Sequence, residues 1–113
     1  MNKISFEDVG CLMATFFAQE GVEDGQVVKM TANATVGPCQ AGEDFCGVAG
    51  MPRNGAVSVQ VGGFVKVPVT LPVNVGRVGL AADGNGGVMA SEEGTAVLVV
   101  DVDTVAKTAV ICL

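Results

Sequence analysis

Residues 57–69 read VSVQVGGFVKVPV, with valine at every odd position except Gly63. Alternate residues of a strand share a face, so a continuous strand would place all six valines on one side. A tight hairpin at Gly62-Gly63 would break this phase, because it would set Val59 against Lys66. The stretch therefore predicts one long bent strand over residues 55–69, with the glycines turning a corner as they do in small barrels.

Outside this stretch the sequence is also typical of β-strands. Valine fills 22 of 113 positions, and turn dipeptides divide the chain into short apolar runs. Valine is branched at Cβ and suits a pleated, half-buried surface. Together these features predict an all-β fold, a small single-domain β-barrel or sandwich of about eight or nine short strands. Asn54-Gly55 is a type I′ turn dipeptide and pairs residues 45–51 with 57–61.

The C-terminal residues predict a second hairpin, between 95–103 and 108–113. In that hairpin we expect Leu98, Val100 and Val102 to face inward. The ranges 25–30 and 76–81 both follow a glycine with an apolar run and a turn, which is a weak sign of internal duplication.

Residues 12–18 are predicted as a strand, because Thr15 and Phe16-Phe17 suit one. A helix over 6–19 is the alternative, since Ser5 and Asp8 resemble a helix cap. Met1–Gly10 is interpreted as an N-terminal arm, and 11–113 as the single β domain. Residues 11–18 are expected to be neither signal peptide nor membrane span, because the acidic Glu7 and Asp8 precede a short apolar run. Synthesis in a reducing cytoplasm is therefore expected.

Catalytic chemistry has little support in the composition, because histidine, tryptophan and tyrosine are absent. The four cysteines lack zinc-site spacing and are expected to be free thiols, with no metal or cofactor. Asp101 and Asp103 lie two apart and could share a Ca²⁺, but solvated outward side chains are the favoured interpretation. The net charge of −6 and the scattered cations argue against nucleic acid as a partner. We predict a protein that is not an enzyme.

Phe64 falls on the face opposite the six valines, together with Pro68. If these two side chains are exposed, they mark a docking or self-association patch. If the barrel closes over both faces, they are core. The sequence leaves both alternatives open.

Several runs carry a family resemblance: 17–21 (FAQEG), 25–28 (GQVV), 47–49 (GVA) and 57–68 around Gly62-Gly63. Across residues 17–80 the chain resembles small capsid decoration, or head-stabilising, proteins of phages and prophages. The resemblance implies a compact barrel in the virion, made in the bacterial host cytoplasm and docked on the major capsid protein. It implies a homo-oligomer, with a trimer favoured, and no catalytic residues. The expected contacts are Ile4 and Phe6 of the arm, with Phe64 and Pro68.

Two other functions stay open from the sequence. One is a small-ligand-binding barrel, with loops 37–44 and 83–87 at a pocket mouth. The other is a cytoplasmic accessory subunit whose partner the sequence does not indicate.

Overall fold

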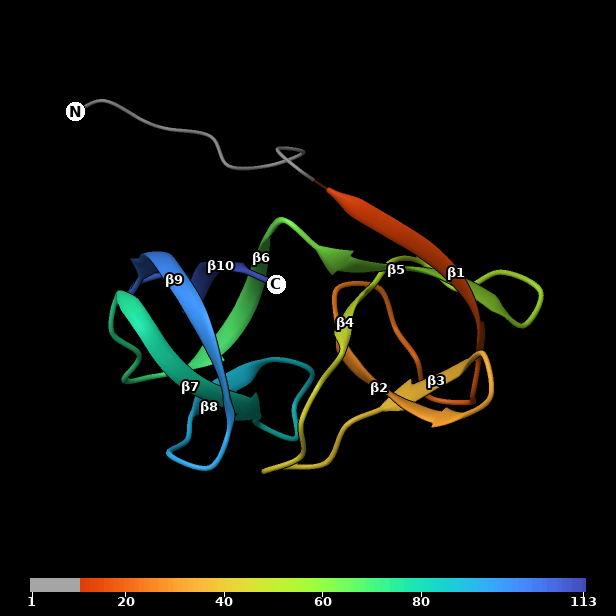
Figure 1. Cartoon of the computed structure of the whole chain (residues 1–113), viewed down its shortest axis with the longest axis horizontal. Helices are drawn as coiled ribbons and strands as arrows, with labels where there is room; N and C mark the ends of the chain where they lie inside the picture. Colours follow the sequence, from red (N-terminus) through yellow and green to blue (C-terminus); the bar gives the residue numbers. More distant parts are fainter. Residues whose placement is uncertain (1–10) are drawn as a thin grey trace.

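The computed structural model describes residues 11–113, which form ten strands (Figure 1). The strands are β1 (Leu12–Ala18), β2 (Val27–Ala32), β3 (Thr35–Pro38), β4 (Gly47–Ala49), β5 (Ala56–Gly62), β6 (Phe64–Thr70), β7 (Gly76–Ala82), β8 (Val88–Ala90), β9 (Thr95–Asp103) and β10 (Thr108–Cys112). They close into two barrels, in the orders β1-β3-β2-β4-β5 and β10-β6-β8-β7-β9. The predicted all-β fold is confirmed, with ten strands and two barrels where one was expected.

The valine-rich stretch is where the chain passes from one barrel to the other. It forms β5 and β6, which meet at Gly63 with a φ of +86°. The two strands do not pair with each other: β5 pairs with β1 and β4, and β6 pairs with β8 and β10. Val59 is fully buried in the first core and Val67 in the second. The predicted phase and the bend at the glycines are therefore correct, but the stretch forms two strands where one was predicted, and the valines divide between two cores.

Both barrels have the same connectivity. In the first barrel, β1 pairs in parallel with β3 and every other pairing is antiparallel. In the second barrel, β6 pairs in parallel with β8 and every other pairing is again antiparallel. Equivalent backbone hydrogen bonds lie beside the β1–β5 pairing of the first barrel and the β6–β10 pairing of the second. The N–H of Ala18 donates to the carbonyl of Gly55, and that of Val69 to Lys107, both over 2.9 Å. The ranges 25–30 and 76–81 contribute to β2 and β7, which occupy equivalent places, as the weak sequence repeat predicted.

The duplication extends to residue register. Five consecutive pairs between β1 and β5 match five pairs between β6 and β10. The matches are Met13↔Gln60 with Phe64↔Cys112, Ala14↔Val59 with Val65↔Ile111, Thr15↔Ser58 with Lys66↔Val110, Phe16↔Val57 with Val67↔Ala109, and Phe17↔Ala56 with Pro68↔Thr108. Each position in these five pairs of the first barrel therefore has a counterpart in the second.

Local structure agrees with the turn chemistry read from the sequence. β1 has the predicted bounds, so the helix alternative is wrong for residues 12–18. Asn54 and Gly55 have φ values of +52° and +78°, as a type I′ turn requires. Arg53 and Ala56, on either side of them, exchange two backbone hydrogen bonds of 2.7 and 2.9 Å. The arm at residues 1–10 lies outside the described residues.

One detail of the C-terminal hairpin was predicted wrongly. β9 and β10 pair as expected, but Val97 and Val99 fill the core in place of Leu98 and Val100. The register shifts beside Val99, so that Val100 is an extra, unpaired residue. Such a bulge reverses the inward and outward alternation of a strand. Only Val102, which follows the bulge, packs against the core as predicted.

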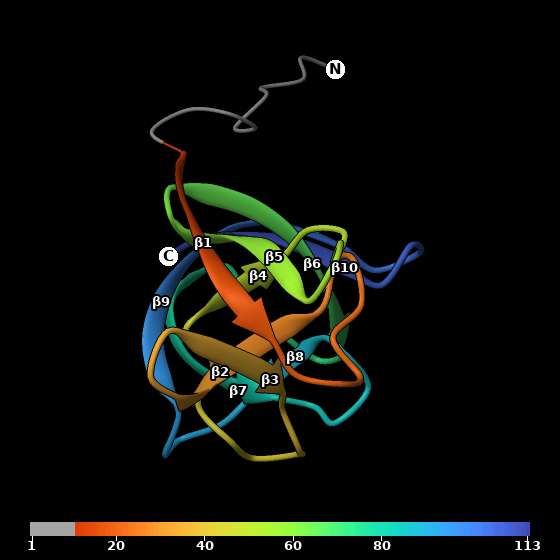
Figure 2. The same ribbon diagram turned by 90° about the vertical axis from the view of Figure 1, so that its right-hand side faces the viewer.

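A joint core and backbone hydrogen bonds connect the barrels. Val27 and Val48 of the first barrel lie in the same buried cluster as Val69 and Leu80 of the second. The N–H of Val27 also donates to the carbonyl of Gly86 over 2.9 Å. Figure 2 shows β1 on the side of the first barrel away from the second. No helix in residues 11–113 is long and apolar enough to span a membrane.

Candidate docking surface

The predicted contact residues differ in what the structure shows of them. Ile4 and Phe6 lie outside the described residues. Phe64 and Pro68 both lie on β6, where Phe64 is half-buried and Pro68 is exposed. Lys66 lies between them, also exposed, so alternate side chains of β6 point away from the barrel core. The outward orientation predicted for Phe64 and Pro68 is therefore correct, and the fully buried alternative is not.

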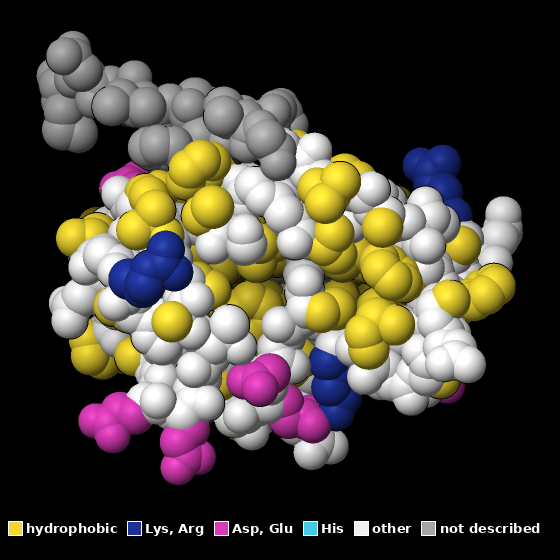
Figure 3. Space-filling model, viewed as in Figure 1, with side chains coloured by type: hydrophobic (Ala, Val, Ile, Leu, Met, Phe, Trp, Pro, Cys, Tyr) yellow, Lys and Arg dark blue, Asp and Glu magenta, His cyan; other side chains and the backbone are white. Residues whose placement is uncertain are grey.

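A larger apolar surface lies on β1. Leu12, Met13 and Phe17 are 60, 47 and 64% exposed, and we call these three residues the β1 patch. Met13 and Phe17 share the outward alternation of β1. Leu12, exposed at the start of the strand, has the alternation of Phe16 and Ala18, which pack against the first core. Figure 3, in the view of Figure 1, shows hydrophobic side chains on the half of the molecule that carries β1 and also on the other half. Soluble monomers seldom expose several large apolar side chains on one element, so such a patch suggests an interaction surface.

Phe17 stands out from its surroundings because its neighbours are small. On β5 it lies opposite Ala56, and on β3 its parallel partner is Thr35. Neither side chain is large enough to cover an aromatic ring, which explains the high exposure of Phe17. Phe17 was not among the contact residues predicted from the sequence. The sequence of β1, LMATFFA, has apolar residues at both odd and even positions. A barrel wall has only one interior face, so some of these apolar side chains must point outward.

Register equivalence relates the β1 patch to the predicted contacts. Met13 corresponds to Phe64, and Phe17 corresponds to Pro68. The residues predicted from the sequence therefore occupy, on the second barrel, the places of the exposed apolar residues on the first. The chain presents two versions of one outer wall. The wall of the first barrel is the more apolar, because Thr15 stands where the second barrel has Lys66. It is also the more exposed, because Met13 is exposed where Phe64 is half-buried.

Asp101 and Asp103 border a small hollow of about 50 Å³ on the second barrel, together with Lys66 and Thr108. The carboxylate of Asp103 accepts the backbone N–H groups of Val105 and Ala106, each over 3.0 Å. These hydrogen bonds from Ala106 and Val105 lower the pKa of Asp103. Asp103 thus caps the β9–β10 turn. No three His, Cys, Asp or Glu side chains of residues 11–113 come together as a metal site.

The four cysteines are free thiols, and burial disfavours the deprotonation of two of them. Burial, assisted by the charge of Glu43, raises the pKa of Cys39 to about 11. Burial also raises the pKa of Cys46. A thiol acts as a nucleophile only when deprotonated, so neither cysteine is activated at neutral pH.

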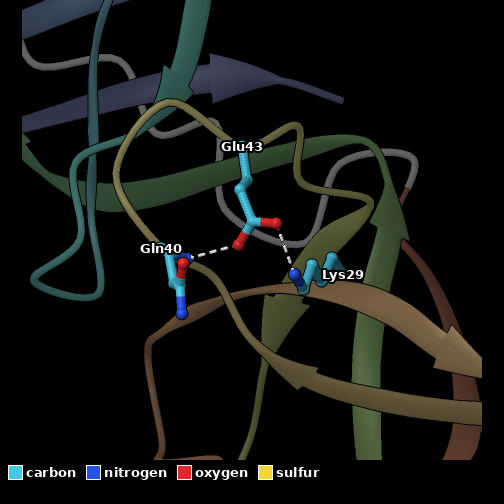
Figure 4. A network of polar contacts seen from close by, with 3 residues as sticks. All are labelled: Lys29, Gln40 and Glu43. Carbon is cyan, nitrogen blue, oxygen red and sulfur yellow. Dashed lines mark hydrogen bonds and ion pairs between the residues drawn. The ribbon is translucent and has the colours of Figure 1, made fainter.

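Loops 37–44 and 83–87, considered above as a pocket mouth, form the junction between the barrels. Gly84, with a φ of +84°, lies so close that a Cβ there would be 3.2 Å from the Cβ of Ala41. Within the first loop, the carboxylate of Glu43 accepts the ammonium of Lys29 and the N–H of Gln40 (Figure 4). The close approach of Gly84 to Ala41 brings the two loops into contact.

The barrel interiors are packed cores. Val36 and Val59 in the first barrel, and Val67 and Leu80 in the second, have no exposed surface. Side chains fill the interior of small barrels, and five strands enclose less space than the eight that hold a small ligand. This packing disfavours a ligand inside either barrel.

No protein-family model matches this sequence, and a search of curated proteins found no match.

Proposed function

We propose that this protein is a non-enzymatic structural protein of a phage or prophage virion, which docks on the capsid shell and stabilises it. Its partner would be the major capsid protein. It would be made in the bacterial host cytoplasm and would act as a homo-oligomer, with a trimer favoured. The observation that carries the proposal is the β1 patch, three exposed apolar side chains on one strand of the first barrel.

The β1 patch has the chemistry that a docking surface needs. Complete burial of a Leu, Met or Phe side chain contributes roughly 1.5–3 kcal/mol, so the three side chains offer several kcal/mol before the losses of association. Aromatic and Met side chains are enriched at the centres of interfaces. Strand β1 lies on the side of the first barrel away from the second (Figure 2), so a partner can reach this strand without separating the barrels.

Rigidity of the chain supports a mechanical role. The two barrels share one buried cluster and are joined by backbone hydrogen bonds. A load applied to the β1 wall would therefore be transmitted to the second barrel through packed side chains. The resemblance to capsid decoration proteins spans residues 17–80, which run from the end of β1 into β7 and so include the transition at Gly63.

The two alternative functions differ in what they require. A small-ligand-binding barrel needs an interior cavity or a loop pocket, whereas the interiors are packed and the two candidate loops contact each other. A cytoplasmic accessory subunit would use the same β1 patch and would differ only in its partner.

Co-sedimentation with capsid shells assembled without this protein tests the proposal. We expect binding to saturate at a fixed ratio to capsid subunits. Phe17→Ser should weaken binding at least about tenfold, because aromatic anchors dominate interface energies. Val75→Ser is the matched control, since Val75 is 62% exposed but lies outside the patch.

The other predicted contacts are tested in the same assay. Deletion of residues 1–10, which removes Ile4 and Phe6, should reduce binding if the arm contacts the shell. Phe64→Ser should reduce it if the second barrel contributes. Failure of the unaltered protein to bind shells would contradict the proposed function. Equal binding by the Phe17→Ser and Val75→Ser variants would exclude the β1 patch as the docking surface.

A further inference from the structure

Arg53 and Asp103 occupy equivalent corners of the two barrels. Arg53 bridges to Ala56 across the β4–β5 turn, and Asp103 pairs with Thr108 across the β9–β10 turn. Ala56 and Thr108 are themselves counterparts, because Ala56 lies opposite Phe17 and Thr108 lies opposite Pro68. The same place on the two walls therefore carries opposite charges.

Both charges are available to a partner. Arg53, Asp101 and Asp103 are exposed, and within residues 11–113 none of the three forms an ion pair. The hollow beside Asp101 and Asp103 also contains Lys66, so its two carboxylates and one ammonium leave a net charge of −1. Its volume of about 50 Å³ admits one or two water molecules, which the flat end of an arginine side chain could replace.

We propose that a second copy of this chain binds here: Arg53 of one copy pairs with Asp101 and Asp103 of the next. The first barrel of one copy then lies against the second barrel of its neighbour. A guanidinium is suited to this role, because its fork of N–H donors matches carboxylate oxygens. The inference rests on the homo-oligomer of the proposed function and deepens it by naming the contact between copies, which requires no shell.

The opposite charges of the two equivalent corners, at Arg53 and Asp103, determine which contact between copies is favoured. Two copies meeting through the same corner would bring Arg53 to Arg53, or Asp103 to Asp103, and like charges repel. Two copies meeting through different corners would bring opposite charges together. Such a heterologous contact uses two different patches of each chain, and it produces a ring when its rotation closes.

Apolar side chains extend the contact on both sides. Met51, two residues before Arg53, is 63% exposed. Val105, two residues after Asp103, is 91% exposed at the tip of the β9–β10 turn. This turn is longer than its counterpart at Asn54-Gly55, so Val105 has no equivalent on the first barrel. Each corner therefore combines one kind of charge with an exposed apolar neighbour, as the rim of an interface does.

Charge exchange tests the inference with the purified full-length protein alone. Sedimentation equilibrium over a range of concentrations gives the self-association constant. Arg53→Glu and Asp101→Arg should each weaken association at least about tenfold, and the double variant should recover most of the loss. Asp101 is preferred to Asp103 for substitution, because Asp103 caps a turn. Arg77→Glu, an exposed site on β7 with the same change of charge, should leave association unchanged.

Three results would overturn the inference. They are a chain that stays monomeric at every concentration, an Arg53→Glu variant that associates as the Arg77→Glu variant does, and a double variant no better than the two single ones. Because the assay contains no shells, failure of shell docking would leave its outcome unaffected.

Discussion

Gly42 and Ala82 belong to different barrels, yet the N–H of Gly42 donates to the carbonyl of Ala82 over 2.8 Å. The N–H of Ala82 in turn donates to the carbonyl of Glu43 over 2.9 Å. The loop between β3 and β4 thus adds to the end of β7 as a short strand would. Its counterpart between β8 and β9 spans only residues 91–94, so the longer loop of the first barrel supplies the junction.

This junction predicts that the two barrels unfold together. Val59→Ala removes volume from the first core and Val67→Ala from the second, and both side chains are fully buried. Each substitution should lower the free energy of unfolding by about 2 kcal/mol. In denaturant titrations followed by circular dichroism, both variants should show one transition. Two transitions, with each substitution shifting only one of them, would contradict a joint unit.

Gly63→Ala should destabilise the passage between the barrels. Gly63 has a φ of +86°, a conformation that costs an L-residue with a Cβ about 1–2 kcal/mol. Gly63→Asn is the matched comparison, because asparagine tolerates positive φ better and should lose less stability. Chemical denaturation of both variants measures the difference. Equal stability of the wild-type protein and the Gly63→Ala variant would show that the bend does not require glycine.

Stability should decline in acid, in part through Glu43. Its hydrogen bond from Lys29, followed by that from the N–H of Gln40, lowers the pKa of Glu43 in the folded state. A lowered folded pKa contributes stability that is fully present above the unfolded value of about 4.3 and is lost as pH falls through the folded value.

Thermal melts of the wild-type protein and the Glu43→Gln variant over that pH range check this prediction. The variant should be less stable at neutral pH and should lose less stability on acidification. Asp103, whose pKa is also lowered, keeps an acid dependence of the same sign in both proteins. Parallel pH profiles would exclude a contribution from Glu43.

Cys39 should resist alkylation in the folded protein. With a pKa of about 11, only about a thousandth of this thiol is deprotonated near pH 8. Mass spectrometry after treatment with iodoacetamide should find Cys39 unmodified under native conditions and modified in denaturant. Since Cys39 packs against the second barrel's core, rapid native modification would indicate that the junction opens.

Short-range patterns were predicted well where local chemistry decides the structure. The valine alternation of residues 57–69, the Asn54-Gly55 turn and the bounds of β1 follow from side-chain period, positive φ and β-branching. The bulge beside Val99 was missed, because β9 reads as an ordinary apolar strand with or without it. The bulge is visible only in the pairing of β9 with β10, where the register shifts by one residue. Phe17 was missed because its exposure depends on its small neighbours on β3 and β5.

The amino-acid sequence by itself determined that this chain forms short strands with an inward valine phase, since period and turn chemistry are local properties. Only the tertiary structure decided that these inward valines are divided between two cores. Val59 and Val67 follow the same sequence pattern, although one is buried in the first barrel and the other in the second. The tertiary structure also decided that Arg53 and Asp103 stand at equivalent corners. Such equivalence comes from strand pairing between distant segments, which no local pattern encodes.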